Sequence, residues 1–141
     1  GRNKSKKGGM GDMKDKQIHI IHCDEVTLSN EWAPEIINKI ESRLIQAPLT
    51  LKSMQDIVGG LIEIYPSRLP KLISLLPDAV NCQEMIINEE GRFNKPVNNI
   101  ATQIAYEILG ADKVTGRIPE TNDIVLKVHG TVFITDNWKI K

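Results

Sequence analysis

The residues best suited to chemistry gather in one polar stretch near the middle of the chain. Residues 88–99 contain six side chains that can contact a ligand: Asn88, Glu89, Glu90, Lys95, Asn98 and Asn99. Glu63 would join them if its strand pairs with the strand that ends at residue 88. Carboxylates bind hard cations or transfer protons, whereas a helix that begins near Asn98 would offer free N–H groups to an anion. The ordinary alternative is a solvated turn followed by a helix cap.

The other reactive side chains lack the spacing that metal binding or covalent catalysis requires. Two histidines and two cysteines have donor atoms that suit zinc, but no Cys-x-x-Cys pair is present: His19, His22, Cys23 and Cys82. Histidines three residues apart in a strand also point to opposite faces. No Gly-x-Ser-x-Gly motif occurs, and His129 is expected in a turn. The sequence therefore predicts no metal site, no cofactor and no catalytic residue, and it favours a non-enzyme without deciding the question.

The composition predicts one folded domain with a basic tail. The chain has 141 residues, of which 40% are hydrophobic, and this is enough for one sizeable core. Residues 1–16 hold six basic and two acidic side chains, which leaves 12 basic and 16 acidic side chains in residues 17–141. We interpret residues 1–16 as a disordered tail or a leftover of an expression tag, and residues 17–141 as a single α+β domain. The alternative for the tail is a nucleic-acid-binding arm that uses Arg2, Lys4, Lys6 and Lys7.

Membrane insertion and secretion are not indicated by the sequence. No run of residues reaches the roughly 18 apolar positions of a membrane helix, and no signal-peptide core follows the basic start. Two cysteines are too few for a disulfide framework. We therefore expect an intracellular protein without membrane contact.

Hydrophobic periodicity and turn residues predict the elements of the first half. One stripe of apolar residues at three- and four-residue steps favours an amphipathic helix: Ala33, Ile36, Ile37, Ile40 and Leu44. Thr50 is a typical N-cap for a second helix, which Gly59 and Gly60 end. The predicted elements are a strand at 17–22, helices at 33–44 and 51–58, and a strand at 61–65.

The second half is predicted to mix short strands and helices. Asn88 and Gly91 suit a β-turn, so residues 92–94 are expected as the returning arm of a hairpin. Asn98 and Gly110 are typical first and last caps of the most regular helix. The predicted elements are a helix at 67–76, a strand at 83–88, a helix at 98–109, a loop at 111–122 and paired strands at 123–128 and 131–135. This order favours an α+β fold with a small, mostly antiparallel sheet of about five strands and three to four helices.

Four short motifs follow one another along residues 50–136. They are 56–63, with the sequence Asp-Ile-Val-Gly-Gly-Leu-Ile-Glu, then 86–91, 98–102 and 130–134. Together they resemble a family of small uncharacterised domains found in phages, large algal viruses and mobile elements. The resemblance implies a viral or mobile-element origin and no defined activity. Residues 17–45 lie outside it, and residues 67–81 are longer than the corresponding connection in the family.

The expected function is a non-enzymatic binding module of viral or mobile-element origin that acts on a host protein or a small phosphate-bearing ligand. Such a module would work in the host cytoplasm or with the virion. Two alternatives stay open: a nucleic-acid accessory protein that uses the basic arm, and a metal-assisted hydrolase built on Glu63, Glu89 and Glu90. A host or viral protein is the expected partner, and the oligomeric state is left open because edge strands can pair across a dimer axis.

Overall fold

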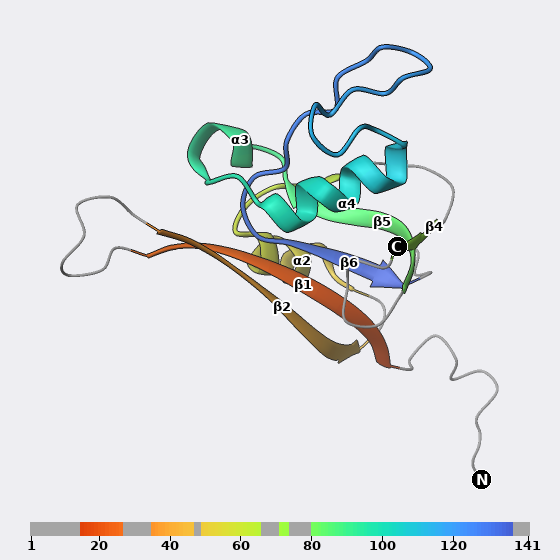
Figure 1. Cartoon of the computed structure of the whole chain (residues 1–141). Helices are drawn as coiled ribbons and strands as arrows, with labels where there is room; N and C mark the ends of the chain where they lie inside the picture. Colours follow the sequence, from red (N-terminus) through yellow and green to blue (C-terminus); the bar gives the residue numbers. More distant parts are fainter. Residues whose placement is uncertain (1–14, 27–34, 47–48, 66–70, 74–79, 137–141) are drawn as a thin grey trace, which may run out of the picture.

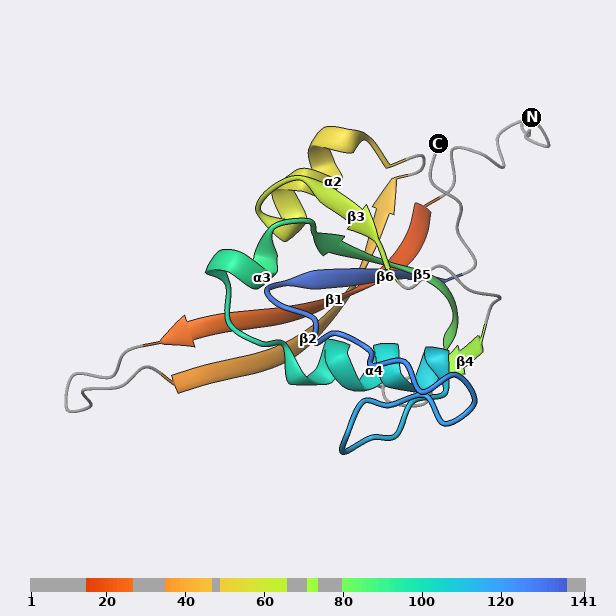
Figure 2. The ribbon, with the colours of Figure 1, turned by 90° about the horizontal axis from the view of Figure 1, so that it is seen from above.

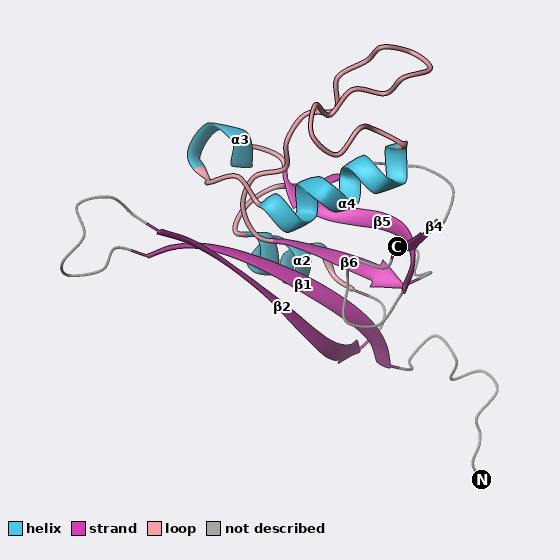
Figure 3. Cartoon of the chain, in the orientation of Figure 1, coloured by secondary structure: helices cyan, strands magenta, loops and turns pink. Residues whose placement is uncertain are grey.

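The computed structural model describes residues 15–26, 35–46, 49–65, 71–73 and 80–136. Its strands are β1 (Asp15–Val26), β2 (Glu35–Gln46), β3 (Ile62–Ile64), β4 (Lys71–Ile73), β5 (Val80–Asn88) and β6 (Val132–Asp136). Its helices are α2 (Leu51–Val58), α3 (Gly91–Asn94) and α4 (Asn99–Leu109). The predicted α+β class is confirmed, with the helices and strands arranged as in Figure 1 and Figure 3.

One antiparallel sheet organises the domain. Its strand order is β2-β1-β6-β5-β3, and β4 pairs with a second part of β5. Helices α2 and α4 lie on opposite sides of this sheet (Figure 2). The central strands β1, β5 and β6 are therefore covered on both faces, which explains why each contains a run of consecutive apolar residues.

Side chains alternate between the two faces of the sheet along the central strands, and this divides the core into two layers. Ile21, Met85 and Ile134 pack with α4 on one face. Ile20, Ile86 and Phe133 pack with α2 on the other face. The period of two along each strand distributes neighbouring residues between the layers.

The predicted helix at 33–44 is wrong over its described residues, which form strand β2. All 12 residues of β2 pair with β1, from Glu35 opposite Val26 to Gln46 opposite Asp15. Ile40 packs on the α4 side of the sheet and Ile45 on the α2 side, so the apolar residues serve two faces. β-branched isoleucines favour this pleated surface over a helix. Ala33 lies outside the described residues.

Three smaller predictions are also corrected. Residues 71–73 of the predicted helix at 67–76 form β4. The other positions of that predicted helix lie outside the described residues. Residues 92–94 belong to the short helix α3 and not to a hairpin arm. The predicted strand at 123–128 does not form, because the only β-bridge within it is an isolated one between Ile124 and Arg117. The strand expected as its partner, β6, pairs with β1 and β5 instead.

The predictions based on helix caps are confirmed. The Thr50 side chain accepts a hydrogen bond from the Ser53 N–H at the start of α2, and Gly59 ends that helix with a φ of 82°. Gly110 ends α4 with a φ of 71°. Both glycines occupy the left-handed region that disfavours other residues. None of the described helices has the length and apolar character needed to cross a membrane.

Asn98 links α4 to the sheet through a fully buried side-chain amide. Its Nδ2 donates to the carbonyl groups of Ile21 at 3.0 Å and Gly130 at 2.9 Å. Its Oδ1 accepts from the Ala101 N–H at 3.0 Å and from Asn38 Nδ2 at 3.3 Å. One side chain therefore joins β1, β2, the start of α4 and the segment that leads into β6.

Replacing Asn98 with Ala should lower the free energy of unfolding by about 3 kcal/mol, because a helix cap and two donated hydrogen bonds are lost in a buried site. Asn98→Asp keeps the cap but places carboxylate oxygen against two carbonyl groups, so it should be at least as harmful. Urea denaturation measures both. The matched control is the exposed neighbour Asn99, whose change to Ala should alter stability by no more than about 0.5 kcal/mol. A tolerated Asn98→Ala would contradict the role of this side chain.

Candidate functional site

A cavity of about 120 Å³ opens between strands β3 and β5, the turn after β5 and the segment before β6. Polar and apolar side chains share its wall, and the polar ones include both signs of charge. The residues that line it are Glu63, Tyr65, Ile87, Asn88, Glu89, Arg92, Leu126, Lys127, Val128 and His129.

Pairing of β3 with β5 brings three of the predicted site residues together. Glu63 stands opposite Ile87, and Ile62 stands opposite Asn88. The Glu89 N–H continues the ladder by donating to the Leu61 carbonyl at 2.8 Å. Glu63, Asn88 and Glu89 therefore reach the same cavity, as expected if their strands pair.

Asn88 forms part of the cavity wall and also fixes the turn that follows β5. Its Nδ2 donates to the Val58 carbonyl at 3.3 Å, and its Oδ1 accepts from the Glu90 N–H at 2.9 Å. The side chain also lies against Gly60, where an added Cβ would come within 2.9 Å of Nδ2. Asn88 thus holds the end of α2 and the turn in place.

The other predicted site residues do not line the cavity. Glu90, Lys95 and Asn99 are exposed outside it. Asn98 is buried, and its amide hydrogen bonds are made within the protein. The start of α4 is therefore not the cavity wall, and the cationic groups of the site come from other positions.

Three residues that line the cavity were not predicted from the sequence: Arg92, Lys127 and His129. The segment 126–129 is distant in sequence from the polar turn, but α4 and the residues before it hold it there. The Asn98 N–H donates to the Val128 carbonyl at 2.8 Å, and the Val128 N–H donates to Thr102 Oγ1 at 2.9 Å. Val97 and His129 form an isolated antiparallel bridge. No local signal in residues 126–129 predicts this placement.

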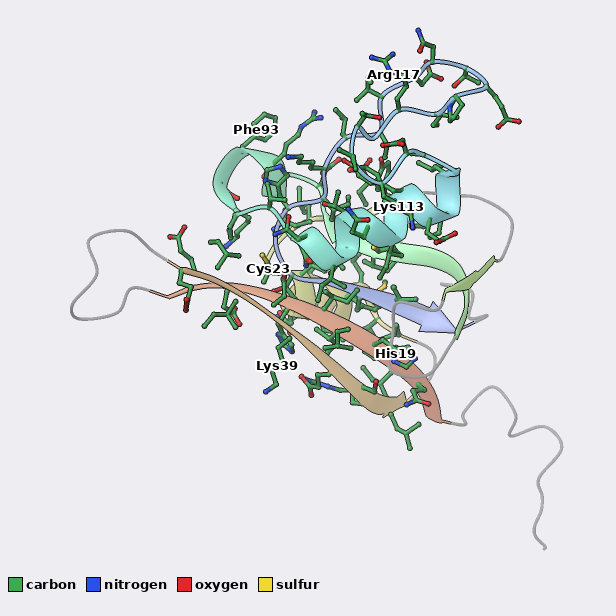
Figure 4. The ribbon with its side chains drawn as sticks, viewed as in Figure 1. His19, Cys23, Lys39, Phe93, Lys113 and Arg117 are labelled. Carbon is green, nitrogen blue, oxygen red and sulfur yellow. The ribbon has the colours of Figure 1, made fainter. Side chains whose placement is uncertain are left out.

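The charges around the cavity are mixed. Glu63 and Glu89 supply carboxylates, while Arg92 and Lys127 supply cations. His129 Nδ1 is hydrogen-bonded at 2.9 Å to the Lys95 carbonyl, so this nitrogen carries the proton. The Arg92 guanidinium lies 5.1 Å from the ring centre of Phe93, which is labelled on α3 in Figure 4. The cavity therefore presents donors for an anion and acceptors for hydroxyl or amine groups.

Tyr65 adds a neutral hydroxyl group to this wall. Burial raises the pKa of Tyr65 above its ordinary value, and the nearby charge of Glu63 raises it further. The phenol therefore stays protonated at neutral pH and can donate a hydrogen bond.

Three of the four side chains considered for zinc form hydrogen bonds elsewhere, and the side chain of Cys82 lies outside the described part of the structure. His19 Nδ1 lies 2.7 Å from Ser42 Oγ, and His22 Nε2 lies 2.8 Å from Glu41 Oε1. Cys23 Sγ donates to the Val97 carbonyl at 3.3 Å. Within the described part of the chain, no three His, Cys, Asp or Glu side chains are grouped closely enough to hold a metal ion.

No family model, curated protein or solved structure matches this chain. The resemblance to the viral and mobile-element domains accordingly depends on the quoted motifs alone. The chemistry of the cavity must be inferred from its own geometry.

Gly91→Ala should lower the free energy of unfolding by about 1 to 3 kcal/mol, because an added Cβ would meet a backbone atom that cannot move aside easily. This Cβ would lie 2.7 Å from the His129 carbonyl oxygen. Ala is otherwise favoured over Gly in a helix, so a loss of stability reports the contact between α3 and the cavity segment. Urea denaturation measures it, with exposed Asn94→Ala in the same helix as the control. Equal or higher stability of Gly91→Ala would contradict this packing.

Proposed function

We propose that this protein is a binding module, encoded by a virus or mobile element, whose cavity holds a small phosphate-bearing ligand. The proposed origin follows from the motif resemblance, and the proposed ligand follows from the cavity. The ligand class is inferred from one observation: Arg92, Lys127 and His129 line the same cavity as two carboxylates.

Arg92 and Lys127 are suited to the phosphate. A guanidinium offers a planar fork of donors to phosphate oxygens, and an ammonium adds a compact charge. Both side chains line the cavity, and the part of the chain that the structure describes contains no ion pair involving either of them. Their positive charges therefore remain available to an incoming anion.

Glu63 and Glu89 favour a ligand with more than a phosphate group. Two carboxylates would repel a free inorganic anion, but they accept hydrogen bonds from hydroxyl or amine groups. A cavity of about 120 Å³ has room for about four water molecules, by the usual volume per water. This space suits a phosphate and a few attached atoms, with the rest of the ligand outside. A phosphorylated sugar or nucleotide fits this description.

A host protein that docks over the same cavity is the second candidate. Two large apolar side chains are exposed at or beside it: Leu126 lines the cavity and is 60% exposed, and Phe93, the neighbour of the lining residue Arg92, is 74% exposed. Aromatic residues are enriched in protein interfaces, where they supply much of the buried area. An acidic or phosphorylated side chain of a partner would then occupy the place proposed for the ligand.

The two alternatives from the sequence receive less support. Arg2, Lys4, Lys6 and Lys7 lie outside the described residues, so the nucleic-acid arm stays a prediction. The hydrolase needs Glu63, Glu89 and Glu90 at one place, and Glu90 is absent from the cavity lining.

The wild-type protein should gain thermal stability with a phosphorylated compound from a panel of nucleotides and sugar phosphates, because a ligand at 100 times its Kd stabilises by about 2.7 kcal/mol. Arg92→Gln and Lys127→Gln should each weaken binding by roughly 10- to 100-fold, since each removes a charge-assisted contact. Differential scanning fluorimetry finds the compound, and isothermal titration calorimetry measures its affinity.

The matched control is Lys52→Gln on α2, where the ammonium is exposed and pairs with Asp56 at 3.2 Å. This variant should bind as the wild type does. Binding that neither cavity variant weakens would place the ligand elsewhere. The absence of any stabilising phosphorylated compound, together with capture of a host protein that Phe93→Ala abolishes, would favour the second candidate.

A further inference from the structure

The outer edge of β2 is the longest unpaired strand edge in the part of the chain that the structure describes. β2 lies at one end of the strand order, and among the described strands only β1 pairs with it. The hairpin of β1 and β2 also reaches beyond the helices that cover the central strands (Figure 1). Its outer edge presents backbone N–H and C=O groups suited to pairing with another strand.

The length of β2, its regular register and its exposed apolar side chains favour pairing with another strand. Two apolar side chains on the same face are exposed, Ile36 at 39% and Leu44 at 64%. Natural edge strands that avoid pairing are short or carry proline, a bulge or charged side chains, and of these β2 has the charged side chains Glu35, Lys39, Glu41 and Arg43. The 12-residue register of β2 with β1 is continuous, and β2 contains no proline.

We propose that the partner of this edge is the β2 strand of a second copy of this chain, paired antiparallel about a two-fold axis at Ile40. The two sheets then form one continuous sheet across the dimer. This inference does not depend on the proposed ligand or on the cavity.

Symmetry leaves few registers for such a pair. Opposing residues in an antiparallel pair point to the same face of the sheet. The two-fold axis must therefore pass between a residue and the same residue of the second copy. Near the middle of the 12-residue strand, this residue is Ile40 or Glu41. Both registers retain almost the whole length of β2.

Charge selects the register centred on Ile40. It places Lys39 opposite the partner's Glu41 twice, once on each side of the axis. The register centred on Glu41 places Glu41 opposite the partner's Glu41 and Lys39 opposite the partner's Arg43. Opposite charges stabilise a cross-strand pair, and like charges destabilise it.

The apolar residues select the same register. With the axis at Ile40, Ile36 stands opposite the partner's Leu44, and the reciprocal pair forms on the other side. Ile40 already packs with the core layer under α4, so all three residues extend this layer across the axis. With the axis at Glu41, Leu44 would stand opposite the partner's Asn38, and only two apolar pairs would form, Ile37 with the partner's Ile45 and its reciprocal, against three with the axis at Ile40.

The charged groups on β2 suit this pairing. The hydrogen bond from His22 holds the pKa of the Glu41 carboxyl below its ordinary value, and Arg43 adds to the effect. Glu41 is therefore ionised at neutral pH. Lys39, labelled in Figure 4, has no ion-pair partner among the residues that the structure describes. The Lys39 ammonium of one copy can therefore pair with the Glu41 carboxylate of the other copy.

Sedimentation equilibrium of the wild-type chain should give a concentration-dependent dimer. Leu44→Lys should weaken it by about tenfold or more, because each interface loses two apolar pairs. The matched control is Leu51→Lys on α2, where the leucine is 58% exposed and is not part of the proposed strand pair. The control should dimerise as the wild type does, and far-UV circular dichroism checks that both variants fold.

Lys39→Glu should also weaken the dimer by about tenfold, since it creates two like-charge pairs across the axis. The double change Lys39→Glu with Glu41→Lys should restore most of the loss, because it reverses both charges of each pair, and far-UV circular dichroism checks that losing the Glu41 contacts with His22 and Arg43 leaves the variant folded. A monomeric wild type, or a dimer that Leu44→Lys leaves intact, would overturn the proposal. A double variant that dimerises no better than Lys39→Glu would overturn the register centred on Ile40.

Discussion

The buried amide of Asn98 is the constraint on which the rest of the structure depends. A side-chain amide without partners is costly in a protein interior, and this one obtains its partners from four different segments. β1, β2, the start of α4 and residue 130 must therefore be in place together. Because the Val128 carbonyl also accepts from the Asn98 N–H, the same junction sets the position of the cavity segment. The cavity is thus a consequence of how α4 is attached to the sheet.

The features that the sequence predicted correctly are those that depend on neighbouring residues. Thr50 and Asn98 cap their helices with their own side chains, and Gly59 and Gly110 end them in a conformation that glycine favours. The adjacency of Glu63 to the turn was predicted only conditionally, because it requires a strand pairing. The register of β3 with β5 supplies that pairing.

The features that the sequence did not reveal depend on distant partners. The apolar residues of β2 fit a helical stripe when the segment is considered alone, and their division between two faces becomes visible only when β1 lies beside them. Lys127 and His129 enter the cavity because Thr102 and Val97 hold their segment, and those contacts span more than 20 residues of sequence. Periodicity carries no information about such contacts.

The two proposed surfaces lie at opposite ends of the strand order. β2 forms one end, and β3, which contributes Glu63 to the cavity, forms the other. A dimer formed through β2 would therefore leave both cavities open at the far edges of a continuous sheet. Neither cavity contains a β2 residue, so dimer formation should not change the affinity of a single site. It would instead raise the avidity for a target that carries two or more suitable groups, since the second contact becomes intramolecular. The dimer edge and the cavity can thus serve one function through separate sets of contacts.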